Sequence, residues 1–110
     1  MPYNPRQGDI VILDFDPQTG HEQKGRRPGL IISNDAFHRR TNMAIVCPVT
    51  NTVSGFPTHI LLDDRTKTRG AVMGEQVKCL DLKARNPSFV ESAPGDITDE
   101  IIDLICSFIE

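Results

Sequence analysis

Two adjacent arginines, Arg26 and Arg27, lie directly before Pro28 at the end of a charged stretch, HEQKGRRPG. Proline restricts the residue before it to extended backbone, so Arg27 is expected at the start of an apolar strand. A guanidinium offers a planar fork of donors that matches a phosphate, and a pre-organised one can stabilise charge on a phosphoryl group. The pattern indicates an anion site, although a solvated loop would also hold two arginines.

Glu22 and Thr50 are the other side chains with suitable chemistry. Glu22 lies five residues before Arg27 in the same segment, where a carboxylate can act as a base or orient the arginine. Thr50 ends an apolar segment, and its hydroxyl can form a strand-end turn or donate to a phosphate oxygen. The dozen residues between the first two apolar segments are more typical of a functional loop than of a simple connector.

The cysteines and histidines show no pattern of a metal or cofactor site. The sequence has no C-x-x-C pair, phosphate-binding glycine loop or dinucleotide fingerprint, so neither a cofactor nor a metal is expected. Each cysteine lies beside an apolar run, which favours a small buried side chain over a zinc ligand or a nucleophile. The histidines fit packed or exposed positions. These residues are Cys47, Cys79, Cys106, His21, His38 and His59.

Short apolar segments separated by turn residues predict a mainly β domain. Their β-branched and aliphatic residues favour strands, and their number suggests a small barrel or a strongly bent sheet. The predicted strands are 9–14, 30–33, 44–50, 58–62, 71–73 and 76–81. In the first of them the alternation of polar and apolar residues is weak, so burial on both faces is expected. One domain, residues 1–110, accommodates all of them.

A helix is predicted over residues 97–109, because apolar residues recur there at the spacing of one helical face. These apolar residues are Ile101, Ile102, Ile105, Phe108 and Ile109. Thr98 is the predicted N-cap, followed by two acids that oppose the helix dipole favourably. A shorter helix is predicted to begin near Asn34 and to end around Arg40.

The net charge of −3 conceals a basic body. Residues 1–90 hold all 12 lysines and arginines against nine acids, whereas the last 20 residues hold six acids and no base. A basic body with an acidic tail is compatible with a nucleic-acid partner. No apolar stretch reaches the roughly 18 residues of a membrane span, and no signal peptide is recognisable, so a cytoplasmic protein is expected.

Three segments resemble the MazF/PemK toxins of bacterial toxin–antitoxin modules. They are GDIVILDFDPQTGHEQKGRRPGLIIS, CPVTNTVSGFPTHILL and GAVMGEQVKCLD. The resemblance spans about residues 8–109 and implies a small SH3-like or plasmid-maintenance-toxin barrel, mainly β (α+β), with a C-terminal α-helix. It also implies sequence-specific, metal-independent cleavage of single-stranded RNA by a homodimer. The implied protein partner is an antitoxin with an acidic, partly disordered segment.

By the same resemblance, Arg27, Thr50 and Glu22 are the expected catalytic residues. The 2′-hydroxyl of the RNA would attack the neighbouring phosphorus, leaving a 2′,3′-cyclic phosphate and a 5′-hydroxyl. The expected RNA-binding residues are Gln23, Lys24, Arg26, Phe56, Gln76 and Lys78. Other functions stay open: a barrel that binds RNA without cutting it, a structural adapter, and a gyrase-poisoning toxin. The last has a characteristic C-terminal tryptophan, and this chain has no tryptophan.

Overall fold

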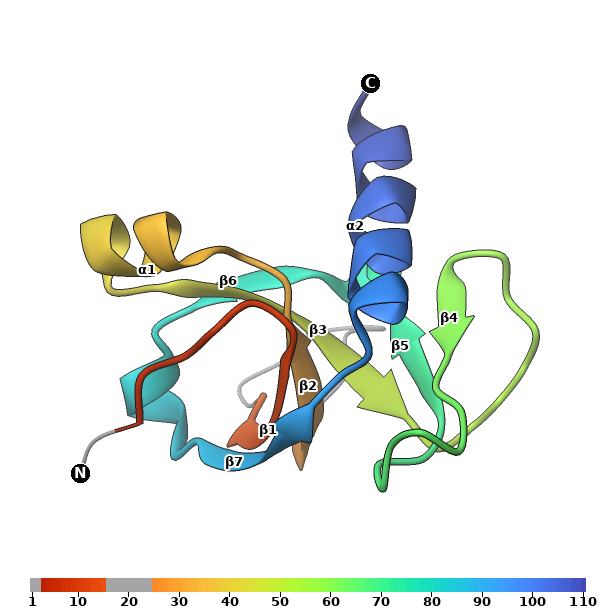
Figure 1. Cartoon of the computed structure of the whole chain (residues 1–110), viewed down its shortest axis with the longest axis horizontal. Helices are drawn as coiled ribbons and strands as arrows, with labels where there is room; N and C mark the ends of the chain where they lie inside the picture. The colour runs from red at the N-terminus through yellow and green to blue at the C-terminus, as the bar shows by residue number, and fades with distance from the viewer. Residues whose placement is uncertain (1–2, 16–24) are drawn as a thin grey trace.

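Seven antiparallel strands form one strongly bent sheet, and a long C-terminal helix packs against it (Figure 1). The computed structural model describes residues 3–15 and 25–110. The strand order is β4-β5-β3-β2-β1-β7, and β6 also pairs with β3. The strands are β1 Asp9–Asp14, β2 Arg26–Ile31, β3 Ala44–Thr50, β4 His59–Leu61, β5 Ala71–Met73, β6 Lys78–Leu80 and β7 Ser88–Ser92. The helices are α1 Asp35–Thr41 and α2 Gly95–Ile109, with 3-10 turns η1 Gly74–Gln76 and η2 Leu82–Arg85.

The prediction of a mainly β fold with a C-terminal helix is confirmed. Three strands have the predicted bounds, namely β1, β3 and β5. β2 begins four residues earlier than predicted, at Arg26, and ends at Ile31, while β4 and β6 are shorter than expected. β7 has no counterpart among the predicted strands, because its sequence SFVES holds only two apolar residues.

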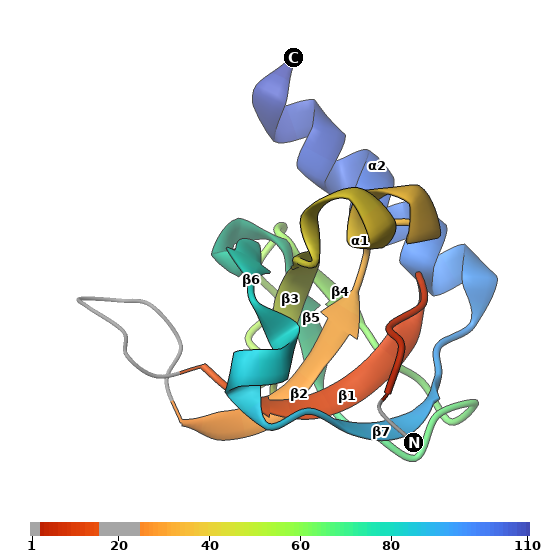
Figure 2. The ribbon, with the colours of Figure 1, turned by 90° about the vertical axis from the view of Figure 1, so that its left-hand side faces the viewer.

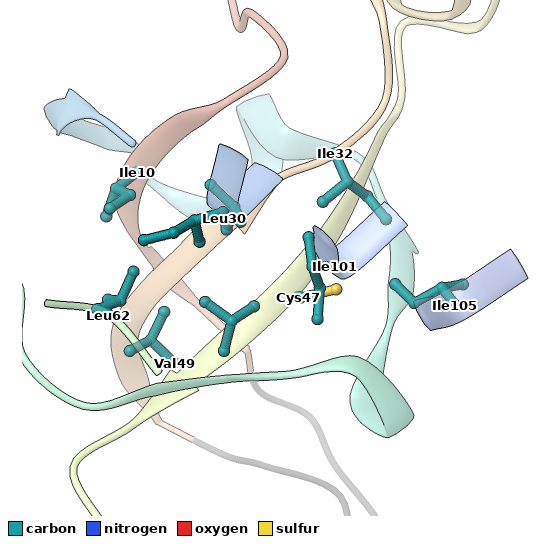
Figure 3. Close-up of a cluster of buried hydrophobic side chains, with 10 residues drawn as sticks. Ile10, Leu30, Ile32, Cys47, Val49, Leu62, Ile101 and Ile105 are labelled. Atoms are coloured by element: carbon teal, nitrogen blue, oxygen red, sulfur yellow. The ribbon is translucent and has the colours of Figure 1, made fainter. Parts of the chain in front are cut away.

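The central strands are buried on both faces, as the weak alternation in 9–14 predicted. One face packs against α2 in the cluster that Figure 3 shows, which consists of Ile10, Leu30, Ile32, Cys47, Val49, Leu62, Val72, Ile97, Ile101 and Ile105. The other face carries a second cluster, of Val11, Leu13, Phe15, Ile31, Ala44, Val46, Leu80 and Leu82. Successive residues of the strands alternate between the clusters, so neither face is left for polar residues.

α2 begins two residues earlier than predicted, and Thr98 is not its N-cap. The cap residue is Pro94, with a φ of −57°. Thr98 lies inside the helix, is buried, and donates its hydroxyl hydrogen to the Pro94 carbonyl oxygen at 3.4 Å. The prediction was wrong because Ile97 and Thr98 both face the sheet, so the first turn has to form before them.

α1 confirms the shorter helix predicted near Asn34. The Asn34 side chain accepts a hydrogen bond from the Phe37 backbone N–H at 3.0 Å, and Asn42 ends the helix in the left-handed conformation. His38 fastens the helix to its surroundings, since its Nε2 lies 2.6 Å from Ser33 Oγ. The helix thus closes the connection from β2 to β3; Figure 2 shows β1, β2 and β3 side by side beneath it.

Two of the three cysteines differ from the prediction. Cys47 is buried in the cluster below α2, and burial raises the pKa of its thiol to about 12. Cys79 and Cys106 are exposed. They line an apolar hollow of about 370 Å³ between β6 and α2, which we call the α2 hollow. The sequence prediction failed for these two cysteines because apolar residues line this open hollow as well as the buried core.

Arg65 ties the loop after β4 to the start of α2. Its guanidinium donates to the carboxylate of Asp63 at 2.8 Å and to that of Asp96 at 2.8 Å. These hydrogen bonds hold the pKa values of both carboxyl groups below their ordinary range. The same bonds raise the pKa of Arg65. The network therefore stabilises the fold only while the carboxyl groups are ionised.

Arg65→Ala is expected to lower the melting temperature modestly at pH 7 and hardly at all near pH 2. The folded pKa values of Asp63 and Asp96 lie below the unfolded ones, so the stabilisation is present above an ordinary carboxyl pKa of about 4. It is lost as the pH falls through the folded values. Thermal melts at both pH values measure this, with Lys83→Ala as the control for loss of one exposed positive charge. An equal difference at both pH values would contradict it.

Candidate active site

The pairing of β2 with β3 brings Arg27 of β2 toward Thr50 of β3. β2 and β3 pair antiparallel, with Gly29 opposite Pro48. Continued by two residues toward the end of β3, this register puts Arg27 opposite Thr50. Residues directly opposite on neighbouring strands point to the same face, with Cβ atoms about 4.5–5.5 Å apart. The register therefore makes a guanidinium and a hydroxyl neighbours on one face of the sheet.

Arg27 is held from both sides by close strand packing. Its backbone partner on β1 is Leu13. A Cβ at Gly29 would lie 2.7 Å from Val46 Cγ1 and 3.0 Å from Leu13 Cδ2. Only a residue without a side chain lets β1, β2 and β3 approach so closely at this point. Arg27 is half-buried, so its backbone is fixed while part of its side chain stays accessible.

Thr50 is fixed at the end of β3 by two contacts. Its hydroxyl oxygen accepts a hydrogen bond from the Thr52 backbone N–H at 3.1 Å, which is the strand-end turn that the sequence allowed. Gly70 has a φ of +116°, and a Cβ there would lie 2.0 Å from the Thr50 carbonyl oxygen. Both the backbone conformation and the contact require glycine at position 70. The hydroxyl hydrogen of Thr50 is still able to donate to a phosphate oxygen.

Thr50 also lines a hollow of about 490 Å³, which we call the Thr50 hollow. It is lined by Thr50, Thr52, Ser54, Phe56, His59, Met73, Glu75 and Gln76. Ala71 of β5 pairs with Thr50, and Met73 of the same strand pairs with His59. Because residues 71 and 73 point to the same face, the side chains of Thr50, Met73 and His59 all face this hollow.

The 3-10 turn η1 brings Glu75 and Gln76 into the Thr50 hollow. β5 and β6 both pair along the same strand, β3, but their registers differ by three residues, which is the length of η1. The chain therefore bulges out of the ladder over these three residues, as strand insertions do near many active sites. The backbone N–H of Gly74 donates to the Thr58 carbonyl oxygen at 2.9 Å and anchors the bulge.

His59 and Glu75 form a pair that sequence reasoning missed. His59 Nε2 lies 3.0 Å from Glu75 Oε2, and the Thr58 hydroxyl donates to Glu75 Oε1 at 2.8 Å. Partial burial alone would raise the pKa of the Glu75 carboxyl, but these hydrogen bonds outweigh it and the pKa lies below its ordinary value. The sequence placed His59 in a strand and gave Glu75 no role. Only the pairing of β4 with β5 brings the two together.

The remaining predicted site residues are spread over the molecule. Gln76 and Phe56, both predicted to bind RNA, line the Thr50 hollow. Arg26 is exposed at the start of β2, with its Nη1 3.3 Å from an oxygen of Asp14. Lys78 lines the α2 hollow instead. Three predicted residues lie outside the described part of the chain, namely Glu22, Gln23 and Lys24.

Residues 3–15 and 25–110 hold neither a cluster of metal-binding side chains nor a membrane-spanning helix. In these ranges, no three side chains of His, Cys, Asp or Glu come together as metal ligands. None of the helices found there has the length and apolar character needed to cross a bilayer. Among the described residues, the side chains at this site that are suited to catalysis or ligand binding are those of Arg27, Thr50, His59 and Glu75.

Comparison with known proteins identifies the family. The profile of the family described as "PemK-like, MazF-like toxin of type II toxin-antitoxin system" matches residues 6–109. The chain belongs to this toxin family. It is 34% identical to Endoribonuclease PemK of Escherichia coli over 109 residues, which cover 94% of this chain and 80% of that relative. It is 31% identical to Endoribonuclease toxin MazF of Escherichia coli strain K12, over 94% of this chain and 88% of that one.

Solved structures of MazF toxins share the fold. MazF from Deinococcus radiodurans is 34% identical and matches with a TM-score of 0.92, over 98% of both chains. A chain of a MazE–MazF crystal structure from the same organism matches with a TM-score of 0.86 at 34% identity, over 98% and 97% of the two chains. The family resemblance of the three sequence segments is thus confirmed along almost the whole chain.

Proposed function

We propose that this MazF/PemK toxin is a sequence-specific, metal-independent endoribonuclease that cuts single-stranded RNA. The observation that carries the proposal is the antiparallel register of β2 and β3, which, continued by two residues, sets Arg27 opposite Thr50, a residue that lines the Thr50 hollow. The names of the relatives, which include Endoribonuclease PemK and Endoribonuclease toxin MazF, support the same activity. A cation beside a hydroxyl donor can bind the oxygens of a phosphodiester and stabilise charge that develops on them.

In the proposed mechanism the RNA supplies its own nucleophile. The 2′ oxygen bonds to the adjacent phosphorus while the bond from phosphorus to the 5′ oxygen breaks, which yields a 2′,3′-cyclic phosphate and a 5′-hydroxyl. Negative charge grows on the non-bridging oxygens during this step. The Arg27 guanidinium stabilises that charge, and the Thr50 hydroxyl donates to one of the oxygens. Glu22 is the proposed group that accepts the 2′ proton or orients Arg27. The leaving 5′ oxygen takes up a proton from the Arg27 guanidinium or from water, which completes the 5′-hydroxyl.

The single-stranded substrate is proposed to cross the Thr50 hollow. Phe56 offers a stacking surface there, and the Gln76 amide can both donate to and accept from a base edge. Three basic or polar residues at and before the start of β2 in the sequence are proposed to contact the RNA backbone, namely Gln23, Lys24 and Arg26. Lys78, beside the α2 hollow, remains a predicted RNA-binding residue.

Arg27→Ala should lower the cleavage rate by roughly 100-fold or more while changing RNA affinity far less. The reason is that the guanidinium interacts mainly with charge that develops in the transition state. Single-turnover cleavage of single-stranded RNA in EDTA measures the rate. Arg40→Ala, which removes an exposed arginine from α1, is the matched control. A fully active Arg27 variant would assign the chemistry to another residue.

The same assay tests the nucleophile. RNA that carries 2′-deoxy or 2′-O-methyl ribose at the scissile nucleotide should stay intact, and so should DNA, because neither offers a free 2′-hydroxyl. Cleavage of such a substrate would end the proposed mechanism. Tight binding of unmodified RNA without any cut would favour the alternative of a non-catalytic RNA-binding barrel.

We further propose that the toxin is a homodimer in which a second copy covers the α2 hollow. This hollow is lined mainly by isoleucines of the sheet and of α2, and Ile109 at its rim is 78% exposed. Figure 1 shows the end of α2 extending away from the sheet. A contiguous apolar surface of this kind is typical of an interface, and a two-fold axis would pair the same surface on both copies.

Ile109→Arg should convert the dimer to a monomer, because it places a charge within the proposed apolar contact. Light scattering coupled to gel filtration should give the mass of two chains for the wild type and of one chain for the variant. Phe89→Arg, which alters an exposed aromatic residue on β7, is the control and should stay dimeric. A wild-type mass of one chain would refute the proposed dimer.

The proposed protein partner is an antitoxin whose acidic, partly disordered segment covers Arg27 and the Thr50 hollow. Residues 1–90 hold 12 bases and nine acids, so the body of the toxin attracts such a segment. Similarity to MazF in MazE–MazF crystal structures supports a partner of this kind. The expected outcome is loss of RNA cleavage at saturating antitoxin, and full cleavage in the saturated complex would contradict this placement.

A further inference from the structure

The lining of the Thr50 hollow suits a nucleobase better than a phosphate. Among the described residues that line it, Glu75 is the one carboxylate, and there is no lysine or arginine. An ionised carboxylate repels phosphate oxygens, whereas it accepts hydrogen bonds from uncharged donors. The volume of about 490 Å³ lies within the range of about 300–1,000 Å³ that is usual for small-molecule pockets. An uncharged ring with donor groups fits these conditions.

Glu75 is held in one orientation and still has acceptor positions to offer. Thr58 and His59 each donate to a different oxygen of its carboxylate. The His59 side chain is 8% exposed, whereas that of Glu75 is 35% exposed. A carboxylate has about four acceptor positions, so two donors leave others available to a ligand. The carboxylate therefore faces the hollow as a pre-positioned acceptor.

The orientation of His59 is explained by Glu75. A carboxylate can only accept, so His59 Nε2 carries the hydrogen and donates. The other ring nitrogen, Nδ1, is buried and has no hydrogen-bond partner among the described residues. Leaving a buried nitrogen unsatisfied is unfavourable, so among the described residues Glu75 supplies the hydrogen bond that orients the ring. The buried His59 ring thus fixes the position of the Glu75 carboxylate through this hydrogen bond.

Phe56 supplies a stacking surface beside the same pair. Its ring meets the His59 ring edge-on, with centroids 5.4 Å apart and an interplanar angle of 68°. It is 59% exposed, so ring surface remains available to a base. Stacking tolerates every base because each has a π face. Phe56 can therefore hold a base without choosing which one, and the choice is left to the polar groups of the hollow.

We propose that Glu75, positioned by His59, selects a nucleobase that carries an amino group, next to the scissile phosphate. This inference rests on the proposed nuclease function and deepens it, because Thr50 lines the same hollow. Cytosine N4, adenine N6 and guanine N2 each offer donors that a carboxylate can accept. Uracil has a single ring donor, N3–H, flanked by two carbonyl oxygens that a carboxylate repels. Glu75 is the specificity residue and His59 the positioning residue.

Glu75→Gln is the first test. The substrates are short RNAs that differ only in carrying A, C, G or U at each position flanking the cut. At one position the wild type should favour at least one amino-bearing base over uracil by roughly tenfold. Glutamine both donates and accepts, so the variant should bring that ratio close to one. Glu100→Gln, which removes an exposed carboxylate from α2, is the matched control and should keep the wild-type ratio.

His59 is tested by the same ratio. His59→Ala should reduce the preference, and His59→Gln, which keeps a donor on a side chain of similar reach, should restore much of it. The double variant with Glu75→Gln should behave like Glu75→Gln alone, because His59 acts through Glu75. If His59 served the fold only, its loss would lower cleavage of all four substrates equally and leave the ratio unchanged, which would overturn its assigned role.

Binding separates this inference from the nuclease proposal. The affinities of the same RNAs, with 2′-deoxy ribose at the scissile nucleotide, report the preference without any cut. A base preference in binding that Glu75→Gln removes would support the inference even if the protein cut no RNA. Equal binding of all four bases by the wild type, or an equal loss for all four in Glu75→Gln, would overturn it.

Discussion

The pairing of β3 on both of its edges is the constraint on which the site depends. β2 occupies one edge, while β5 and β6 share the other. A slip of one residue would turn Arg27, Thr50 and their neighbours to the opposite face. It would also move the apolar side chains of the slipped strand out of the cluster in which they pack, at a cost of about 1.5–3 kcal/mol for each large one that is no longer buried. The two clusters thus fix the register, and the register places the site.

Arg27 and Thr50 could be predicted because local chemistry marks them. A proline after Arg27 fixes the strand start, and a mainly apolar segment, AIVCPVT, ends at Thr50. The His59–Glu75 pair depends instead on contacts between segments 16 residues apart, and residues 74 and 75 fell between two predicted strands, with no role assigned to Glu75. β7 and the start of α2 were missed for a related reason. Burial of Ile97 and Thr98 against the sheet overrides the capping preference of threonine, which is a local property.

The charges of the site divide it into two parts. Arg27 lies on one side of Thr50 along the sheet, and Glu75 lies on the other side. RNA carries anionic phosphates and uncharged bases. The Arg27 guanidinium attracts a phosphate, whereas the Glu75 carboxylate repels it. A nucleotide placed the wrong way round would bring its phosphate to Glu75. The opposite charges therefore favour a single orientation of the substrate, through repulsion as much as through attraction.

The two parts also differ in how firmly the fold holds them. Arg27 and Thr50 lie on β2 and β3, between the two clusters, and Gly29 and Gly70 lock the backbone behind them. The residues proposed to surround the base lie on η1, on the edge strand β4 and on the segment 51–57, which is exposed throughout. Substitutions in this outer part disturb few buried contacts. The proposed base specificity can therefore change while Arg27 and Thr50, the proposed phosphate-binding pair, keep their geometry, because the two proposed roles depend on different strands.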